Sequence, residues 1–206
     1  GIRLIDTMLD AVVAAGINEI IIVRGHLGGE FDQLLEKYPH IRFVENPHYK
    51  NTNNISSAMV IRDLIKNAYV FEADLFLNNH SLIQKYEYCS NILGAWMEKD
   101  NDWCFNVNNG IINRVGFGGV NCYHWYGVSY YSKEDGYKLE RHLPLAYNME
   151  GGKKIFLEQV VIETFKEEYK ICIRPCSCAE IFEIDTISDL FKLDPNYELK
   201  LVNTAK

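Results

Sequence analysis

Apolar runs of strand length alternate with segments of helical periodicity along much of this chain. Residues 19–23 form a nearly continuous apolar run, which is typical of a parallel strand buried on both faces. The preceding segment, 5–15, has apolar residues at the spacing of an amphipathic helix and ends at Gly16. Further strands are predicted at 41–44 and 68–73. The alternation predicts an α/β fold with a Rossmann-like, doubly wound sheet, mixed or parallel, flanked by helices.

The middle of the chain has a different pattern. Residues 90–131 are rich in β-forming side chains and contain the turn sequence Asn108-Asn109-Gly110, which predicts an antiparallel hairpin region inserted beside the main sheet. Further helices are predicted at 56–65, 132–147, 153–168 and 188–193, the last with Ser188 as its N-cap, and a strand at 169–173.

Composition narrows the classes of function. The 206 residues, 48% of them hydrophobic, fit one domain. The net charge of −7, with both signs interspersed, disfavours nucleic acid and anionic membranes as partners. Because no apolar stretch reaches the roughly 18 residues of a membrane span, and the first residues do not resemble a secretory signal, we expect a cytoplasmic protein.

The six cysteines are expected to be reduced thiols in an ordinary core. The pair Cys176-Ser177-Cys178 has the wrong spacing for a zinc knuckle and no matching pair elsewhere, so a cysteine metal site is disfavoured. The histidines, including His124, show no spacing that suggests a triad or a zinc site.

Two aspartates each close a strand-like apolar run: Asp74 after 68–73 and Asp185 after 180–184. Carboxylates at the ends of strands in an α/β sheet can converge, and Mg²⁺ prefers such oxygens together with a nucleotide's phosphates. The pair therefore predicts a catalytic Mg²⁺ site. Either aspartate alone fits a turn or a helix N-cap equally well.

Four stretches in a fixed order carry a resemblance to a known family. They are Gly16–Gly25, Asn46-Pro47-His48-Tyr49 with 53–57, the strand ending in Asp74, and Glu183-Ile184-Asp185-Thr186. The chain resembles the nucleotidyltransferases, and within them the choline-phosphate cytidylyltransferases of bacterial surface-polysaccharide pathways. The resemblance implies the nucleotide-diphospho-sugar transferase-like fold and Mg²⁺-dependent transfer of CMP from CTP to a small phosphorylated acceptor, with release of pyrophosphate.

The same resemblance implies roles for individual residues. Asp74 and Asp185 would hold Mg²⁺, and nucleotide contacts would come from Gly25, Asn53, Asn54 and Ser57. Gly25 also fits an ordinary turn, and the two asparagines fit a helix-capping loop.

The resemblance also implies phosphocholine as the acceptor, whose quaternary ammonium is best held by aromatic faces with a nearby carboxylate. The candidate residues are Trp103, Trp125, Tyr126, Phe156 and Glu158, and each aromatic also fits plain core packing. Leu157 stands where a second aromatic is expected, so phosphoethanolamine, another small phosphate or a sugar phosphate stays open, as does UTP in place of CTP. The aromatic hairpin also fits a homodimer surface.

The family's first strand and glycine-rich triphosphate loop are missing from this chain, which begins in the helix after them. We therefore expect residues 1–206 to be a single, N-terminally incomplete nucleotidyltransferase domain, with an acceptor-binding insertion at about 90–131. Lack of that strand would uncover two strand edges and empty part of the core. A noncatalytic nucleotidyltransferase-like module is the alternative to an enzyme, although keeping both aspartates argues against it.

Overall fold

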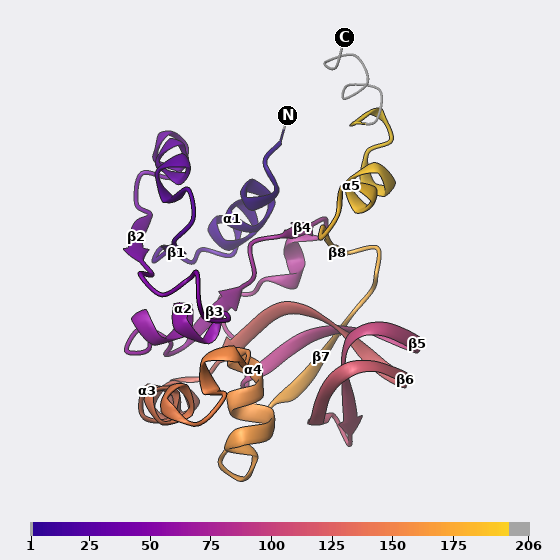
Figure 1. Ribbon diagram of the computed structural model, residues 1–206. Helices are drawn as coiled ribbons and strands as arrows, with labels where there is room; N and C mark the ends of the chain where they lie inside the picture. The colour runs from indigo at the N-terminus through magenta and orange to yellow at the C-terminus, as the bar shows by residue number, and fades with distance from the viewer. Residues whose placement is uncertain (1, 198–206) are drawn as a thin grey trace.

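A four-stranded mixed sheet forms the centre of the computed structural model, which describes residues 2–197 (Figure 1). Strand β5 is parallel to β7, whereas the β3–β6 and β5–β6 pairs are antiparallel. In spatial order the strands are β3 (Ala68–Phe71), β6 (Ile111–Tyr131), β5 (Asn91–Asn108) and β7 (Cys172–Cys176).

Two smaller sheets and a set of helices complete the structure. A parallel pair consists of β1 (Ile21–Arg24) and β2 (Arg42–Glu45), and an antiparallel pair of β4 (Leu75–Leu77) and β8 (Ile181–Glu183). The α-helices are α1 (Leu4–Ala14), α2 (Ile55–Val60), α3 (Lys133–Asn148), α4 (Leu157–Gln159) and α5 (Ile187–Leu193). Shorter 3₁₀ or π turns are η1 (Gly28–Glu36), η2 (His80–Leu82), η3 (Gly152–Lys154), η4 (Val160–Thr164) and η5 (Lys166–Glu168).

Helices cover both faces of the central sheet because successive residues of a strand point to opposite sides. Ile92 on β5 packs into the core that holds Leu139 and Leu143 of α3, whereas the next residue, Leu93, packs with Met8 of α1. All of these side chains are buried, and each stabilises the fold by about 1.5–3 kcal/mol relative to exposure. The predicted doubly wound α/β architecture is confirmed, with a mixed sheet.

Helix α3 begins and packs for local reasons that the sequence shows. The Ser132 hydroxyl accepts a hydrogen bond from the backbone N–H of Asp135, which satisfies one of the free donors of the first turn. One residue later, Gly136 lies so close to the segment before β3 that a Cβ there would be 1.9 Å from the carbonyl oxygen of Ile65. The helix can lie against this segment only because that position has no side chain.

A large cavity separates β1 from β3. Among the described strands, β1 pairs only with β2, and β3 only with β6, so one edge of each faces this space. The cavity has a volume of about 1070 Å³ and is lined largely by apolar residues of both strands and of α1, with polar and charged side chains at one end.

The structure differs from the sequence expectations in five places. The helix expected at 56–65 ends at Val60, and the strand expected at 169–173 forms instead at Cys172–Cys176. The hairpin at 91–131 does not lie beside the main sheet, because β5 and β6 are its two central strands. The helix expected at 153–168 is divided into η3, α4, η4 and η5. The last helix begins one residue early, and its N-cap is Thr186 rather than Ser188, since the Thr186 hydroxyl accepts from the N–H of Asp189.

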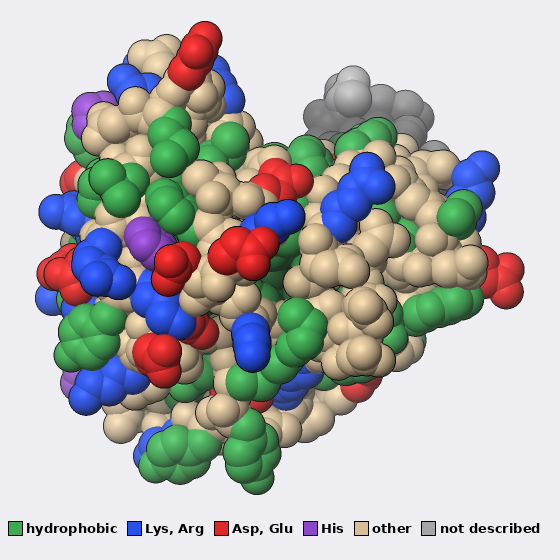
Figure 2. Space-filling model, turned by 90° about the horizontal axis from the view of Figure 1, so that it is seen from below, with side chains coloured by type: hydrophobic (Ala, Val, Ile, Leu, Met, Phe, Trp, Pro, Cys, Tyr) green, Lys and Arg blue, Asp and Glu red, His purple; other side chains and the backbone are tan. Residues whose placement is uncertain are grey.

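The surface and the helices add two observations. Figure 2 shows acidic and basic side chains interspersed on the face in view, without a broad region of one sign. Within residues 2–197, none of the helices has both the length and the hydropathy to span a bilayer.

Candidate active site

Asp74 and Asp185 lie next to each other at one end of the cavity. Asp74 immediately precedes β4, and Asp185 is the second residue after β8. The backbone N–H of Ile184 donates to the Asp74 carbonyl oxygen at 3.0 Å. The strands that these aspartates were expected to close, β3 and β8, lie in different sheets; the two residues meet because Asp74 also precedes β4, which is antiparallel to β8. In an antiparallel pair the start of one strand lies beside the end of the other, and this brings the two aspartates together.

Two glutamates that the sequence analysis did not select join this site. Carboxylate oxygens of Glu72, Asp74 and Glu183 lie within 4.8 Å of one another. Burial, followed by the Glu158 carboxyl, raises the pKa of Glu72 to about 8, and burial also raises the pKa of Asp74 and of Glu183. Repulsion between like charges in a partly dry site favours either protonation or a bound cation.

A signal for these glutamates is present in the sequence. Glu72-Ala73-Asp74 and Glu183-Ile184-Asp185 share the pattern Glu-x-Asp. Each of these glutamates lines the cavity together with the aspartate two residues after it. The repeated pattern therefore brings a second carboxylate from each segment to the same end of the cavity.

Three aromatic rings, those of Trp103, Trp125 and Phe156, pack against one another in the cavity wall and are called the aromatic box. The ring centroids of Trp103 and Phe156 are 5.1 Å apart, those of Trp125 and Phe156 5.3 Å, and those of Trp103 and Trp125 6.0 Å. All three pairs are close to perpendicular, so each ring presents an edge to the face of a neighbour. The residues come from β5, β6 and the segment before α4, and all three line the cavity.

Glu158 places a buried carboxylate in the same part of the cavity. Its side chain is 2% exposed; Oε1 accepts from the Ser129 hydroxyl at 2.8 Å, while Oε2 is buried without a hydrogen-bond partner. Burial raises the pKa of this group. A buried carboxylate oxygen with no donor is costly in a folded protein, so this atom is suited to a ligand that donates a hydrogen bond or carries positive charge.

Asn54 joins the acidic end of the cavity to the segment that carries Glu158. Its Nδ2 donates to Glu72 Oε1 at 2.8 Å, and its Oδ1 accepts from the backbone N–H of Leu157 at 2.8 Å. Ser57 lies one turn further along and also lines the cavity, and its hydroxyl accepts from Asn46 Nδ2 at 3.1 Å.

Three other predicted residues do not line the cavity. Asn53 bonds to its surroundings instead: its Nδ2 donates to the Lys154 carbonyl and its Oδ1 accepts from the N–H of Asn54. Gly25 packs against a ring, since a Cβ there would lie 2.6 Å from the Tyr49 side chain. Tyr126 is buried in the core on the α1 side of the sheet. Of the predicted set, the structure thus brings together Asp74, Asp185, Asn54, Ser57, Trp103, Trp125, Phe156 and Glu158.

Comparisons with known proteins identify the relatives of a chain with this site. No protein-family model matches the chain. Over 201 residues it is 33% identical to the 2-aminoethylphosphonate cytidylyltransferase of Lancefieldella rimae, an alignment that covers 96% of this chain and 81% of that protein. The chain belongs to the cytidylyltransferase family. A second relative, the choline-phosphate cytidylyltransferase of Haemophilus influenzae, is 28% identical over 192 residues, covering 89% of this chain and 81% of that enzyme.

Comparison with solved structures leads to the same family as the comparison of sequences. The CTP:phosphocholine cytidylyltransferase of Streptococcus pneumoniae matches with a TM-score of 0.84 and 26% identity, over 93% of this chain and 84% of that one. The predicted membership of the nucleotidyltransferases and the predicted fold are confirmed. The chain is a nucleotidyltransferase-type enzyme, and the alternative of a noncatalytic module is set aside.

Proposed function

We propose that this cytidylyltransferase transfers CMP from CTP to a small acceptor that carries a phosphonate or phosphate at one end and an ammonium group at the other. The observation that carries the proposal is the pairing, in one cavity, of a carboxylate cluster with an aromatic box that has a free buried carboxylate oxygen. CTP as the donor is supported by the similarity of the chain to two cytidylyltransferases, those of Lancefieldella rimae and Haemophilus influenzae. In the reaction an oxygen of the acceptor attacks the α-phosphorus of CTP, and pyrophosphate leaves.

Mg²⁺ fits the residues at the acidic end. Asp74 Oδ1 is buried without a hydrogen-bond partner, and the neighbouring carboxylate oxygens are the ligand type that this ion prefers. Asp74 and Asp185 would hold it, with Glu72 and Glu183 adding negative charge close by. When bound, Mg²⁺ supplies charge neutralisation at the transferring phosphoryl group.

The protein's own side chains then have separate tasks. Asn54 fixes the Glu72 carboxylate through its amide, and so keeps that charge directed at the phosphoryl end. The aromatic box and Glu158 would bind the ammonium end, which aligns the acceptor along the cavity. In this proposal Asn54 and Ser57 remain the candidates for nucleotide contacts, with Gly25 and Asn53 shaping the adjoining loop.

Two acceptors are favoured by different observations. The unpartnered Glu158 oxygen favours a primary ammonium, which can donate a hydrogen bond to it, as in 2-aminoethylphosphonate. The ring faces that line the cavity favour a quaternary ammonium, as in the phosphocholine expected from the sequence. Aromatic rings bind either kind of cation, whereas the unpartnered Glu158 oxygen suits only an ammonium that can donate a hydrogen bond. We therefore place 2-aminoethylphosphonate ahead of phosphocholine.

The test is pyrophosphate release by the full natural protein, including any residues that precede Gly1. Each of the four nucleoside triphosphates is combined with Mg²⁺ and with 2-aminoethylphosphonate, phosphocholine, phosphoethanolamine or a sugar 1-phosphate. We expect release with CTP and an ammonium-bearing acceptor, with the highest kcat/KM for 2-aminoethylphosphonate. Preference for a sugar 1-phosphate would overturn the acceptor proposal, and preference for UTP would overturn the donor.

Variants test the metal site separately. Asp74→Asn and Asp185→Asn should each lower kcat/KM by at least about 100-fold, because a metal contributes several kcal/mol to charge stabilisation. Asp63→Asn is the matched control, since Asp63 is an exposed aspartate. Folded Asp74→Asn protein with unchanged kcat/KM would rule out the assignment of the metal ligands.

A further inference from the structure

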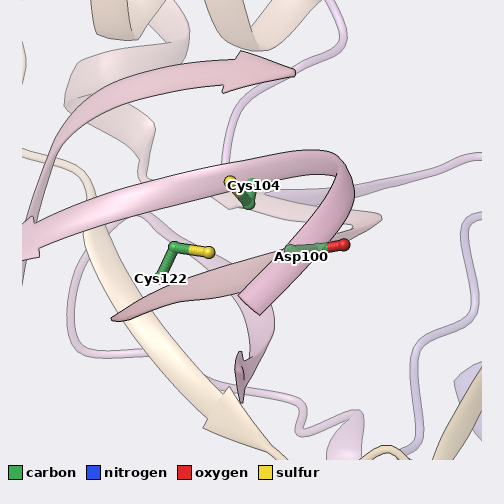
Figure 3. Close-up of side chains that lie close together, drawn as sticks. All are labelled: Asp100, Cys104 and Cys122. Carbon is green, nitrogen blue, oxygen red and sulfur yellow. The ribbon is translucent and has the colours of Figure 1, made fainter. Parts of the chain in front are cut away.

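A second group of metal-binding side chains lies on the β5–β6 hairpin, apart from the carboxylates described above. One oxygen of Asp100 and the sulfurs of Cys104 and Cys122 lie within 4.8 Å of one another (Figure 3). The three residues are 8%, 4% and 1% exposed. Neither cysteine belongs to the Cys176-Ser177-Cys178 sequence that was considered for a metal site.

Strand geometry explains how residues so far apart in sequence converge. Cys122 and His124 are two residues apart on β6 and so share a face, and β-pairing places Cys104 of β5 opposite His124. Asp100 lies opposite Gly119, near the end of the hairpin's irregular segment. In Figure 3 the Cys122 side chain points toward the space bounded by the other two residues.

Gly119 leaves room for both sulfurs at this point. A Cβ on Gly119 would lie 2.7 Å from Cys104 Sγ and 3.0 Å from Cys122 Sγ. Any larger residue would push the sulfurs out of this position. The backbone therefore forms a close wall around a small space that contains two thiols and a carboxylate.

Asp100 is oriented by its own hydrogen bonds. Oδ1 accepts from the backbone N–H of Asp102 at 3.0 Å, and Oδ2 lies 2.8 Å from His124 Nδ1. Carboxylates and histidines at metal sites are commonly fixed by such outer contacts. His124 Nε2 in turn lies 3.7 Å from a Glu183 oxygen, so the histidine bridges this group and the acidic end of the cavity.

We propose that Asp100, Cys104 and Cys122 bind one Zn²⁺ ion, with His124 as the positioning residue that orients the Asp100 carboxylate. A site with two thiolate sulfurs and one carboxylate oxygen binds zinc in preference to the hard cations magnesium and calcium. Around a tetrahedral zinc with Zn–S of about 2.3 Å and Zn–O of about 2.1 Å, ligand atoms lie roughly 3.3–3.8 Å apart. Since the three atoms already lie within 4.8 Å, small side-chain rotations bring them to this geometry.

The ion would cross-link the two strands of the hairpin, which carry Trp103 and Trp125 of the aromatic box. It would join β5 to β6 one residue from Trp103 and three residues from Trp125 along the chain. Binding requires deprotonation of both thiols, so their protons are released to solvent when zinc enters. This inference does not depend on the acceptor or on the nucleotide.

The test is metal content and cobalt spectroscopy on the full chain, purified under reducing conditions without chelator. We expect one zinc per chain, and, after exchange, a sulfur-to-cobalt charge-transfer band of the intensity given by two thiolates. Cys104→Ser and Cys122→Ser should each lose that intensity and the zinc. Cys178→Ser is the matched control and should keep both, since Cys178 is exposed and lies on another segment.

Further variants keep the proposal testable if the cysteine variants fail to fold. Asp100→Asn should lower zinc affinity while the thiolate band persists at high cobalt, and His124→Ala should lower it by roughly 10–100-fold, as for other outer contacts of metal ligands. A folded wild-type chain that holds no zinc and gives no thiolate band with cobalt would overturn the proposal. A Cys104–Cys122 disulfide in protein kept in reductant, or a band equally intense in Cys104→Ser, would also overturn it.

Discussion

Replacing Glu72 with glutamine tests whether the cavity holds its carboxylates as close together as the structure shows. Burial first, and then the Glu158 carboxyl, raises the pKa of Glu72 from 4.5 to about 8. Glutamine keeps an oxygen that can accept the Asn54 amide hydrogen bond, so the local geometry can be preserved while the titration is removed.

The sign of the effect follows from proton binding. Between pH 4.5 and about 8 the folded protein keeps the Glu72 proton that the unfolded chain has lost. The folded state then binds more protons, so the free energy of unfolding falls as pH rises through this window. The contribution is fully present below pH 4.5 and is lost above about 8.

The magnitude comes from the same pKa values. The difference between 4.5 and about 8 corresponds to at most about 5 kcal/mol, at 1.36 kcal/mol per pKa unit. A protein of this size changes its melting temperature by roughly 2–4 °C per kcal/mol. Between pH 5 and pH 8.5 the wild type should therefore lose on the order of 10 °C more than Glu72→Gln.

The assay is thermal unfolding followed by circular dichroism at several pH values, first in EDTA and then with Mg²⁺. Glu98→Gln is the control, since Glu98 is an exposed glutamate on β5, and it should follow the wild type. At high pH, Mg²⁺ should raise the melting temperature of the wild type more than that of Glu72→Gln, because the cation offsets the charge of the ionised carboxylates. Parallel pH curves for wild type and Glu72→Gln in EDTA would refute the reasoning.

Three further substitutions have expected outcomes. Trp103→Ala should raise the KM for an ammonium-bearing acceptor by about 2- to 30-fold, the size of a cation–π contact, and leave the KM for CTP unchanged. Steady-state kinetics with each substrate varied in turn tests this. An equal rise in both KM values would mean that the ring has only a packing role. Gly136→Ala puts a methyl group 1.9 Å from the Ile65 carbonyl oxygen, so thermal unfolding should show a loss of about 1–3 kcal/mol or more, and an unchanged melting temperature would contradict the close approach of α3. Gly25→Ala puts a methyl group 2.6 Å from the Tyr49 ring, so we expect the free energy of unfolding to fall by about 1–3 kcal/mol. Combining Gly25→Ala with Tyr49→Ala should cause no larger loss of stability than Gly25→Ala alone.

Elements with a local signal could be predicted from the sequence, and those set by long-range pairing could not. Apolar spacing predicts the helix at 4–14, and the capping residue Ser132 marks the start of the helix that follows it. The central position of β5 and β6 depends instead on partners far along the chain, because Asn91 pairs with Cys172, and Tyr69 with Tyr130. A β-rich pattern shows that a segment forms strands but does not show which strands they join.

The candidate site divides in the same way. The two aspartates were selected because each closes an apolar run, and this local signal was enough to place both at the cavity. The aromatic box was expected from residue type and resemblance, and its three rings do meet, but Tyr126 could not be separated from Trp125 by composition. They are adjacent in sequence, and the alternation of β6 sends Trp125 to the cavity side and Tyr126 into the opposite core.

The acidic cluster shows why site residues can be missed even when their pattern is visible. A glutamate two residues before an aspartate is unremarkable by itself, and in either segment alone it would be solvated. The sequence does not show that the two Glu-x-Asp segments lie against each other, because a strand-forming pattern does not identify the partner strand. Antiparallel pairing of Leu75 with Glu183 does bring them together, because it lays the end of one segment against the start of the next. The repulsion among the resulting carboxylates is then a property of the pair of segments, and the need for a cation there follows from strand direction as much as from residue type.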